Sequence, residues 1–456
     1  MSLQRFQFSS ELRRPAGEVF RWHEKPGALE RLTPPWARID VLDEGQIENG
    51  SHTKLRQKVG GLSFNWDVEH LDVRGGKEFT DVQRRGPFHS WTHRHCLAQT
   101  GAGGATLLDD IEYVLPGGLV GNALAGGRVR RELERTFRFR HQRLAADLEA
   151  TSRYGAVRPL RILISGASGL IGRELIPFLR TQGHEIVRLV RGPARRIDEV
   201  SWDPISGKLD EHAIRVVDAV IHLAGVNVAR RWTAQARTEI WQSRVNGTRT
   251  LVEAIARLRH RPFVFVSAAA TGYYGSRGAD ALTESAAKGS SFLADLCQAW
   301  EHEVAAIDEL AIRSVALRTG VVLSTKGGAL AKLLPIFRAG LGGKLGGGEQ
   351  FMSWISIDDI VGAYYHAMLD QRCAGPVNAV TPNAVTNREF TEVLARVLHR
   401  PAWASVPAAA LRLAYGEMAN ETLLASSLVV PAKLQSAGYE FRHPELEPAL
   451  KFLLGK

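Results

Sequence analysis

The chain has 456 residues, of which 45% are hydrophobic and 23% charged, a composition typical of globular proteins with two or three domains. No apolar run approaches the ~20 residues that span a bilayer, the first residues lack a signal-peptide pattern, and the three cysteines lie far apart. We therefore expect a cytoplasmic protein without a membrane partner. The net charge of +10 could indicate nucleic acid, but the main basic cluster, residues 128–140, interleaves acidic and apolar residues like a solvated helix, so no nucleic-acid partner is expected.

Residues 1–150 lack alternating strands and helices. A strand around Phe6 and Phe8 and helical stretches within residues 15–32 are followed by segments of alternating hydrophobicity. These segments span residues 53–59, 64–73, 78–83, 89–98 and 105–114. A long helix at about 128–148 closes the region, which predicts an α+β domain with an antiparallel sheet curled around that helix. This order resembles the helix-grip fold of START-type and polyketide-cyclase-like domains, which implies a cavity for an apolar ligand.

One of these strands carries His89, Trp91, His93 and His95 on the same face. Histidines on one face could bind a metal, but neighbours two apart on a strand are separated by about 6.6 Å along the chain. Convergence on one ion is then difficult. We therefore expect cavity lining or aromatic packing, and no metal.

A glycine-rich motif opens the next region, after an expected linker at 151–159. A short apolar strand, 161–165, leads into Gly166, Gly169 and Gly172, and a helix and a second strand at 185–191 complete a βαβ unit. Glycines at this spacing let the backbone turn tightly and approach a pyrophosphate, which rests on the helix N-terminus. Residues 160–456 are therefore expected to form a Rossmann-type doubly wound parallel sheet that binds a dinucleotide.

The second strand of this unit ends at Arg191. NAD-binding folds place an acidic residue there to receive the ribose 2′-hydroxyl, whereas a guanidinium can pair with the 2′-phosphate of NADP. One charge-assisted hydrogen bond contributes roughly 1.5–3 kcal/mol, or ~10- to 150-fold selectivity. The sequence thus favours NADP(H) over NAD(H), while Arg195 and Arg196 are expected only to solvate a loop.

Further motifs indicate which family of dinucleotide-binding proteins this region resembles. His222-Leu223-Ala224-Gly225 follows a strand, and Ser243-Arg244-Val245-Asn246-Gly247-Thr248 opens a helix. Together with stretches 271–275, 318–324, 340–359 and 431–441, they resemble the extended short-chain dehydrogenase/reductase superfamily and, within it, the atypical NAD-dependent epimerase-like family. That family carries a small C-terminal domain of unknown function, here about 380–456, and some bacterial members carry an N-terminal helix-grip domain.

The resemblance implies a set of cofactor contacts. The phosphates of the cofactor would contact the glycine-rich turn. The adenosine ribose would contact Arg191, and the adenine would contact the residues after His222. The full predicted set is Gly166, Ser168, Gly169, Leu170, Ile171, Gly172, Arg191, Leu223, Ala224, Gly225, Glu239, Arg244, Ser267 and Val322.

The usual catalytic pair of the superfamily is missing. Ordinary members use Tyr and Lys in a Tyr-x-x-x-Lys arrangement, where Tyr transfers the proton and Lys assists it. Aligned on Glu301, those positions are Leu293 and Cys297, and neither can replace them. The remaining candidates are Thr271, Tyr273 and Tyr274, although aromatic packing over the nicotinamide is an alternative role for both tyrosines.

Two functions follow from the sequence. The first is an NADP(H)-dependent oxidoreductase or nucleotide-sugar-epimerase-like enzyme that holds a small-molecule substrate between the Rossmann core and the C-terminal segment. The alternative is an NADP(H)-binding sensor or scaffold with little catalysis, whose N-terminal domain binds an apolar ligand.

Overall fold

The computed structural model describes residues 2–59, 61–101, 103–155 and 157–456. Contacts divide the chain into two compact units. The first unit contains residues 1–157, 180–182 and 454–456, and the second contains residues 158–179 and 183–453. Across the part of the chain that is described, no helix combines the length and the apolar character needed to cross a membrane.

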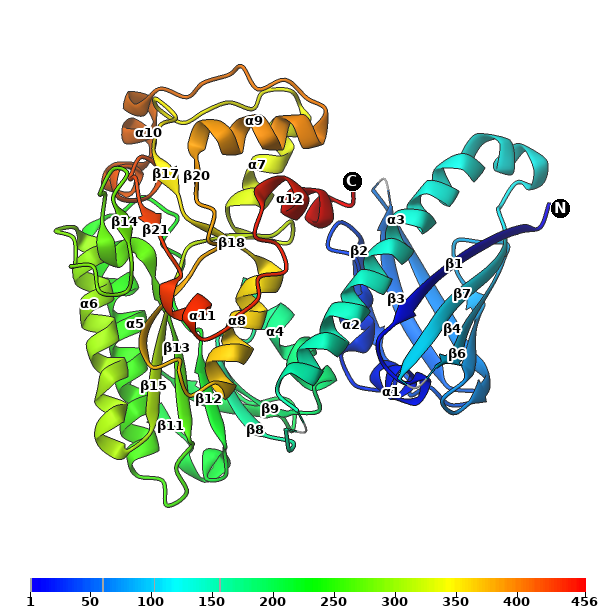
Figure 1. Cartoon of the computed structure of the whole chain (residues 1–456), viewed down its shortest axis with the longest axis horizontal. Helices are drawn as coiled ribbons and strands as arrows, with labels where there is room; N and C mark the ends of the chain where they lie inside the picture. The colour runs from blue at the N-terminus through cyan, green and yellow to red at the C-terminus, as the bar shows by residue number, and fades with distance from the viewer. Residues whose placement is uncertain (1, 60, 102, 156) are drawn as a thin grey trace. The chain divides into compact units, whose positions relative to one another are not determined.

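The first unit is rich in β-structure (Figure 1). Its strands are β1 (Gln4–Leu12), β2 (Arg38–Asp43), β3 (His52–Val59), β4 (Leu62–Arg74), β5 (Glu78–Arg85), β6 (Ser90–Thr100) and β7 (Gly104–Val114). They form one antiparallel sheet in the order β1-β7-β6-β5-β4-β3-β2. Two short helices, α1 (Ala16–His23) and α2 (Ala28–Leu32), follow β1, and the long helix α3 (Gly118–Arg153) follows β7.

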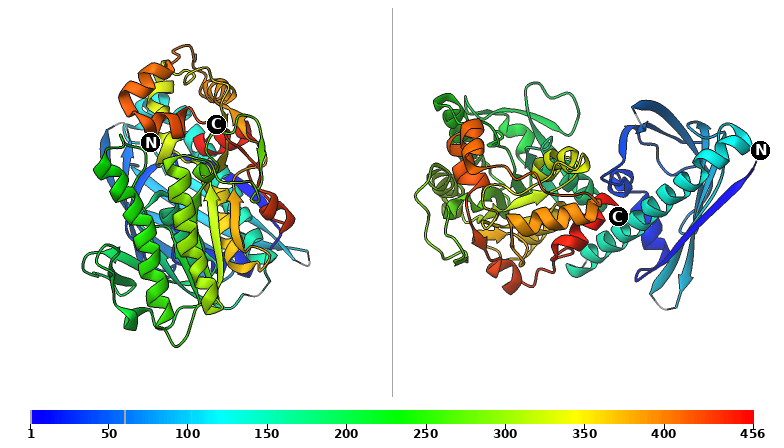
Figure 2. Two further views of the ribbon diagram at one scale, coloured as in Figure 1. Left: turned by 90° about the vertical axis from the view of Figure 1, so that its left-hand side faces the viewer. Right: turned by 90° about the horizontal axis from the view of Figure 1, so that it is seen from above.

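Helix α3 lies along one face of this sheet (Figure 2). Phe137 of α3 packs with Phe6, Trp91 and Ile111, because alternating residues of the strands point to the helix. The five segments predicted from alternation are strands β3 to β7. Strand β2 was missed. Helix α3 starts ten residues before the predicted helix, and these first turns were not predicted because they are rich in glycine, a weak helix former. The helix continues to Arg153, so the first residues of the expected linker are helical.

The second unit contains an eight-stranded sheet in the order β11-β10-β9-β8-β12-β13-β15-β19. The strands are β8 (Arg161–Ser165), β9 (Glu185–Arg191), β10 (Glu199–Asp203), β11 (Lys208–Leu209), β12 (Ala219–His222), β13 (Val264–Ala270), β15 (Arg313–Thr319) and β19 (Gly375–Ala379). All neighbours pair in parallel except β10 and β11. The chain moves outward from β8 to β9 and then returns to β12 on the other side, which is the doubly wound order. The predicted Rossmann-type fold is confirmed.

Helices cover both faces of this sheet (Figure 1). Helices α5 (Ala234–Ala256) and α6 (Phe292–Ala305) lie on one face, where Leu251, Phe265 and Trp300 belong to one buried core cluster. Helices α4 (Leu170–Thr181) and α8 (Ile357–Leu369) meet on the other, where Phe178 packs edge-on against Tyr365 with ring centroids 5.3 Å apart. Both faces are therefore buried, as a parallel sheet requires.

Short elements connect and extend the strands and helices of the second unit. In chain order they are η1 (Glu211–Ile214), η2 (Thr271–Tyr274), β14 (Ala281–Leu282), η3 (Ala306–Leu310), β16 (Val321–Leu323), α7 (Gly328–Arg338), β17 (Phe351–Met352), β18 (Trp354–Ser356), β20 (Val385–Thr386), α9 (Asn387–Leu398), α10 (Ala408–Tyr415), η4 (Ala419–Leu423), β21 (Leu428–Val429), α11 (Ala432–Ser436) and α12 (Leu446–Leu454). Strand β21 pairs with β14, and β20 pairs with β17, so the C-terminal segment is joined by backbone hydrogen bonds to loops of the Rossmann core.

A buried ion pair supports the first unit and predicts a stability effect. The Arg31 guanidinium donates two hydrogen bonds of 2.7 Å to the Asp147 carboxylate, and both side chains are almost fully buried. Arg31→Met would leave the carboxylate without that partner and lower the free energy of unfolding by about 3–5 kcal/mol. Urea unfolding of the full chain measures this, with Arg5→Met as the control because its Asp110 partner pairs with an exposed guanidinium. An unchanged midpoint in Arg31→Met would contradict the prediction.

Candidate functional site

Close backbone contacts surround the three glycines of the turn after β8. Gly166 has a φ of +71°, and a Cβ there would lie 2.7 Å from the Leu223 carbonyl carbon. At Gly172 a Cβ would lie 2.5 Å from the Gly166 oxygen, and at Gly169 3.1 Å from it. These distances are too short for any side chain at Gly166 and Gly172. The turn therefore leaves its backbone open at the N-terminus of α4, the arrangement that receives a pyrophosphate.

The ends of β8 and β12 are tied together at this turn. Ser165 Oγ lies 2.6 Å from His222 Nδ1 and accepts hydrogen bonds from the amides of Leu223 and Ala224, at 3.1 and 3.2 Å. Burial, with a smaller effect of the Arg244 charge, lowers the pKa of His222 to about 3, so the ring is neutral. Since the chain reverses direction across the sheet between these two strands, their carboxyl ends border the crevice in which doubly wound folds bind ligands.

Two arginines at the end of β9 have different surroundings. Arg188 is held by the Asp198 carboxylate at 2.9 and 2.7 Å and by Glu199 at 3.1 Å. Arg191, the last residue of β9, is exposed, and its guanidinium makes no hydrogen bond or ion pair with the described residues. Of the two, Arg191 is the one available to an external anion.

Arg244 is placed beside the loop after β12. Its Nη1 donates to the carbonyls of Val226 at 3.0 Å and Ile240 at 3.3 Å, and the guanidinium lies 5.2 Å from the centre of the Trp300 ring. A Cβ at Gly225 would meet this guanidinium at 3.1 Å. Burial lowers the pKa of Arg244. This side chain holds the loop at Gly225 against α5 and adds positive charge next to the glycine-rich turn.

The other predicted cofactor residues are spread over the same edge of the sheet. Ser168 is exposed at the tip of the turn, Leu170 begins α4 with Ile171 after it, and Val322 lies in β16. Leu170 lies near the loop that follows β16, because a Cβ at Gly327 would come within 3.1 Å of its Cδ1. Glu239 is on α5, where the Arg230 guanidinium donates to it at 2.7 Å.

Ser267 differs from the rest of this set. It pairs in register with His222 inside the sheet, is fully buried, and donates to the Ala268 carbonyl at 2.9 Å. Ser267 is level with Ser165 and His222, the last residues of β8 and β12, although β13 continues to Ala270. The structure therefore brings Ser267 to the same edge as the turn, Leu223–Gly225 and Val322, with its hydroxyl buried against its own strand.

The three proposed catalytic residues lie in η2, directly after β13, but they are not equivalent. Tyr274 is fully buried, donates to Asn378 Oδ1 at 2.7 Å and accepts from Arg318 at 2.8 Å. Burial raises the pKa of its hydroxyl. Tyr273 is only partly buried, and its hydroxyl makes no hydrogen bond with any described residue. Thr271 begins η2 and is also partly buried.

Arg318 organises this cluster. It forms a bidentate pair with Glu301, with both distances at 2.7 Å, and lies 3.6 Å from the centre of the Tyr273 ring. Burial opposes its charge, but the Glu301 carboxylate outweighs this and raises the pKa of the guanidinium. The Tyr273 ring is therefore held in place by a cation on its face while its hydroxyl stays available.

Helix α6 carries no proton-transfer pair. Leu293 is buried against Gly272, and Cys297 is buried on the same helix, where burial raises the pKa of the thiol to about 12. The helix N-terminus is capped from the C-terminal segment, since Glu421 accepts hydrogen bonds from the amides of Phe292 at 3.1 Å and Leu293 at 2.9 Å. The position where other superfamily members have tyrosine is thus closed by packing.

Asp359 joins the start of α8 to the C-terminal segment. Ser356 is the N-cap of α8, and its hydroxyl accepts a hydrogen bond from the Asp359 amide at 2.9 Å. The Asp359 carboxylate accepts from the amides of Arg442 and His443 at 2.6 and 3.0 Å, which anchors the C-terminal segment.

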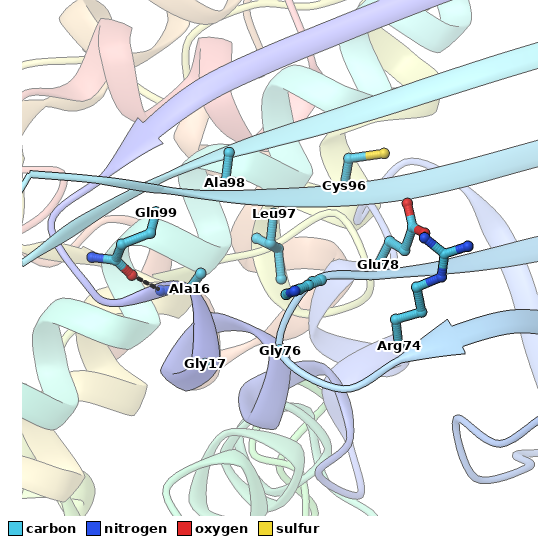
Figure 3. A pocket seen from close by; sticks show the side chains of 10 residues that line it. Ala16, Gly17, Arg74, Gly76, Glu78, Cys96, Leu97, Ala98 and Gln99 are labelled. Carbon is cyan, nitrogen blue, oxygen red and sulfur yellow. Dashed lines mark hydrogen bonds and ion pairs between the residues drawn. The ribbon is translucent and has the colours of Figure 1, made fainter.

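The first unit has a cavity of about 590 Å³ between α1, the β4–β5 turn and β6 (Figure 3). Its lining includes the charged residues Arg74, Lys77 and Glu78, and Gln99 accepts a hydrogen bond from the Ala16 amide at 3.0 Å. Arg74 and Glu78 form an ion pair of 3.0 Å. Such a lining is not the apolar enclosure that a hydrophobic ligand requires.

Comparison with known proteins adds to this geometry. A family model described as the NAD dependent epimerase/dehydratase family matches residues 162–379, and one described as a domain of unknown function, DUF1731, matches residues 406–453. An epimerase family protein of Mycobacterium bovis is 40% identical over 292 residues, which are 64% of this chain and 96% of the relative. The chain belongs to the NAD dependent epimerase/dehydratase family. The family resemblance inferred from residues 160–456 is thereby confirmed.

Two solved structures extend the likeness within this family. The crystal structure of a nucleoside-diphosphate sugar epimerase from Corynebacterium glutamicum has a TM-score of 0.82 and 30% identity, covering 99% of this chain and 90% of that one. The human epimerase family protein SDR39U1, solved with NADPH, has a TM-score of 0.59 and 32% identity, covering 64% of this chain and 99% of that one. The first of these likenesses includes the sheet-rich unit as well.

Several residues of the site could not be found from local sequence. The Ser165–His222 contact, the Glu421 cap and the Arg318–Glu301 pair each join segments far apart in the chain. The sequence offered one signal for the last of these, because Arg318 lies within an apolar strand and a buried charge needs a partner.

The two tyrosines of η2 differ in a way that stability measurements can detect. Tyr274→Phe would leave Arg318 and Asn378 short of a hydrogen bond and lower the free energy of unfolding by about 1–3 kcal/mol. Tyr273→Phe is the matched control, because its hydroxyl has no partner among the described residues. Chemical denaturation of both variants tests this. Unchanged stability of Tyr274→Phe would contradict the structural role of its hydroxyl.

Proposed function

We propose that the second unit binds NADP(H) across the ends of β8 and β12, and that the protein is an oxidoreductase or nucleotide-sugar-epimerase-like enzyme. The observation that carries the proposal is the glycine turn between β8 and α4, where the strand order of the sheet reverses. Arg191, whose guanidinium has no partner among the described residues, ends the neighbouring strand β9. Two relatives support it. The human protein was solved with NADPH, and the Corynebacterium protein is described as a nucleoside-diphosphate sugar epimerase.

In this proposal the pyrophosphate lies on the amides of Gly166–Gly172, where the positive end of α4 favours an anion. The 2′-phosphate pairs with the Arg191 guanidinium, and the loop Leu223–Gly225, held by Arg244, borders the adenosine. NADPH supplies hydride chemistry when bound. The protein's own contribution is to orient the cofactor and to keep the buried His222 neutral beneath it.

Proton transfer requires a group other than the usual tyrosine–lysine pair. We propose Tyr273, whose ring is fixed over Arg318 and whose hydroxyl has no partner among the described residues. Tyr274 is the weaker candidate, since its hydroxyl already donates to Asn378. Thr271 would contribute a hydroxyl in the same turn, as an orienting group.

One observation supports the second candidate function, an NADP(H)-binding sensor or scaffold. Helix α6 has the buried residues Leu293 and Cys297 at the positions where the superfamily usually has its proton-transferring tyrosine and its lysine. Cofactor binding without turnover is consistent with this. A screen of carbonyl compounds and nucleotide sugars with NADPH separates the two. Turnover supports the enzyme, and stoichiometric NADPH binding without turnover across the screen supports the sensor.

For the first unit, we propose the helix-grip assignment, with a domain at about 1–150 and the second domain from 160. The antiparallel sheet and the packing of α3 across it support this. The expected apolar ligand is not part of the proposal. Buried His93 and Asp109, which are hydrogen-bonded to each other, lie on the sheet face under α3 and make it more polar than the lining of an apolar cavity.

Cofactor selectivity tests the role of Arg191. Arg191→Ala is expected to weaken NADPH binding by ~10- to 150-fold and to leave NADH binding almost unchanged, because only NADPH carries the 2′-phosphate. Fluorescence titration of both cofactors measures this. Arg195→Ala is the control, as its exposed side chain lies on the following loop. Equal affinity of the wild type for the two cofactors, or an unchanged ratio in Arg191→Ala, would reject this role.

Activity tests the role of Tyr273. With a substrate from the screen, Tyr273→Phe is expected to reduce kcat by ~10²- to 10⁴-fold, the usual contribution of a general acid, without weakening NADPH binding. Steady-state kinetics and cofactor titration on the same preparations provide both values. Full turnover in Tyr273→Phe would exclude its hydroxyl as the proton donor.

A further inference from the structure

The sheet face that α3 covers in the first unit carries a buried polar cluster that the proposed function does not use. Asp81 of β5 and His93 and His95 of β6 each offer one ligand atom, and these atoms all lie within 4.8 Å of one another. Both histidines are buried, and the Asp81 side chain is 21% exposed. The cluster therefore combines two buried imidazoles with a partly buried carboxylate.

The expectation from strand spacing was that His93 and His95 would not converge. In the structure their ring centroids are only 3.9 Å apart. The two Cα positions obey the strand repeat, but the side chains lean along the strand toward each other. His95 is also stacked on Phe79, with centroids 4.0 Å apart, which fixes the plane of its ring.

A second set of residues orients these three. Asp109 of β7 accepts from His93 Nε2 at 2.7 Å, lies 2.8 Å from His95 Nδ1, and accepts from His141 Nε2 of α3 at 2.5 Å. His70 of β4 donates from Nδ1 to one Asp81 oxygen at 2.7 Å. The other Asp81 oxygen faces His95 Nε2 at 3.4 Å. Carboxylates behind imidazole ligands are the usual outer partners of metal sites.

The charge of the cluster also fits a cation. Asp81 and Asp109 place two carboxylates against the imidazoles of His70, His93, His95 and His141. All the ion pairs of these two carboxylates within the described residues are to histidines. Arg140 is the further cation that contributes to their electrostatics.

We propose that Asp81, His93 and His95 bind a divalent transition-metal ion of the Fe²⁺ to Zn²⁺ class in the first unit. Two imidazoles and one carboxylate suit these ions and not Mg²⁺ or Ca²⁺, which prefer oxygen ligands alone. Asp109 is a positioning residue that holds both rings. Three protein ligands leave a coordination position open. The site is separate from the dinucleotide proposal, and neither depends on the other.

The test uses the full chain after treatment with a chelator. Co²⁺ titration followed by visible absorption, and Zn²⁺ competition against it, should show saturation at one ion per chain with micromolar or tighter affinity. The His93→Gln/His95→Gln double variant should lose this binding, and Asp109→Asn should weaken it by ~10- to 100-fold. His52→Gln is the matched control, because His52 pairs with Asp67 on the same sheet at a more exposed position.

Two results would overturn the proposal. One is the absence of saturable Co²⁺ or Zn²⁺ uptake by wild-type protein whose circular dichroism shows it folded; His95 is then an imidazolium between two carboxylates. The other is equal uptake by the wild type and the double variant. Anomalous diffraction from Zn²⁺-soaked wild-type crystals tests the site without any variant, with a peak expected at ~2.0–2.2 Å from the three side chains.

Discussion

The close approach of the Gly166 backbone to the start of the loop after β12 determines how the second unit is built. A Cβ at Gly166 would lie 2.7 Å from the Leu223 carbonyl carbon, and only glycine tolerates both that distance and the φ of +71°. The Ser165 hydroxyl joins the same two strand ends from beneath. Because these strands border the reversal of the sheet, the contact fixes the turn, the N-terminus of α4 and the 223–225 loop as one edge.

A second constraint lies beside the end of β13, where Arg318 of the neighbouring strand β15 holds the turn that carries the tyrosines. Arg318 joins Glu301 of α6 to both tyrosines of η2. This pair crosslinks helix, strand and loop inside the core, so the turn that carries Tyr273 is rigid without help from a lysine on α6. Glu421 closes the N-terminus of that helix from the C-terminal segment. The same segment is thus part of the site's support, which explains why two matched family regions occur in one compact unit.

The sequence predicted those features whose cause is local. Alternation located strands β3 to β7, and the glycine spacing with its flanking strand and helix located the βαβ turn, because period and backbone freedom are local properties. Strand β2 escaped, since its mixture of charged and apolar residues gives a mixed burial pattern. The partners of Arg318 and Asp81 come from other elements, so no window of sequence could reveal them. The backbone spacing of His93 and His95 predicted that their side chains would not converge. In the structure the two rings lie close together because their side chains lean toward each other.

The central claim is that the edge formed by β8, β9 and β12 holds NADPH with its 2′-phosphate at Arg191. A crystal structure of the full chain with NADPH tests it most directly. We predict the pyrophosphate on the amides of Gly166–Gly172 and the 2′-phosphate within hydrogen-bonding distance of the Arg191 guanidinium. Density for the cofactor elsewhere, or a 2′-phosphate directed into solvent with Arg191 turned away, would contradict the account.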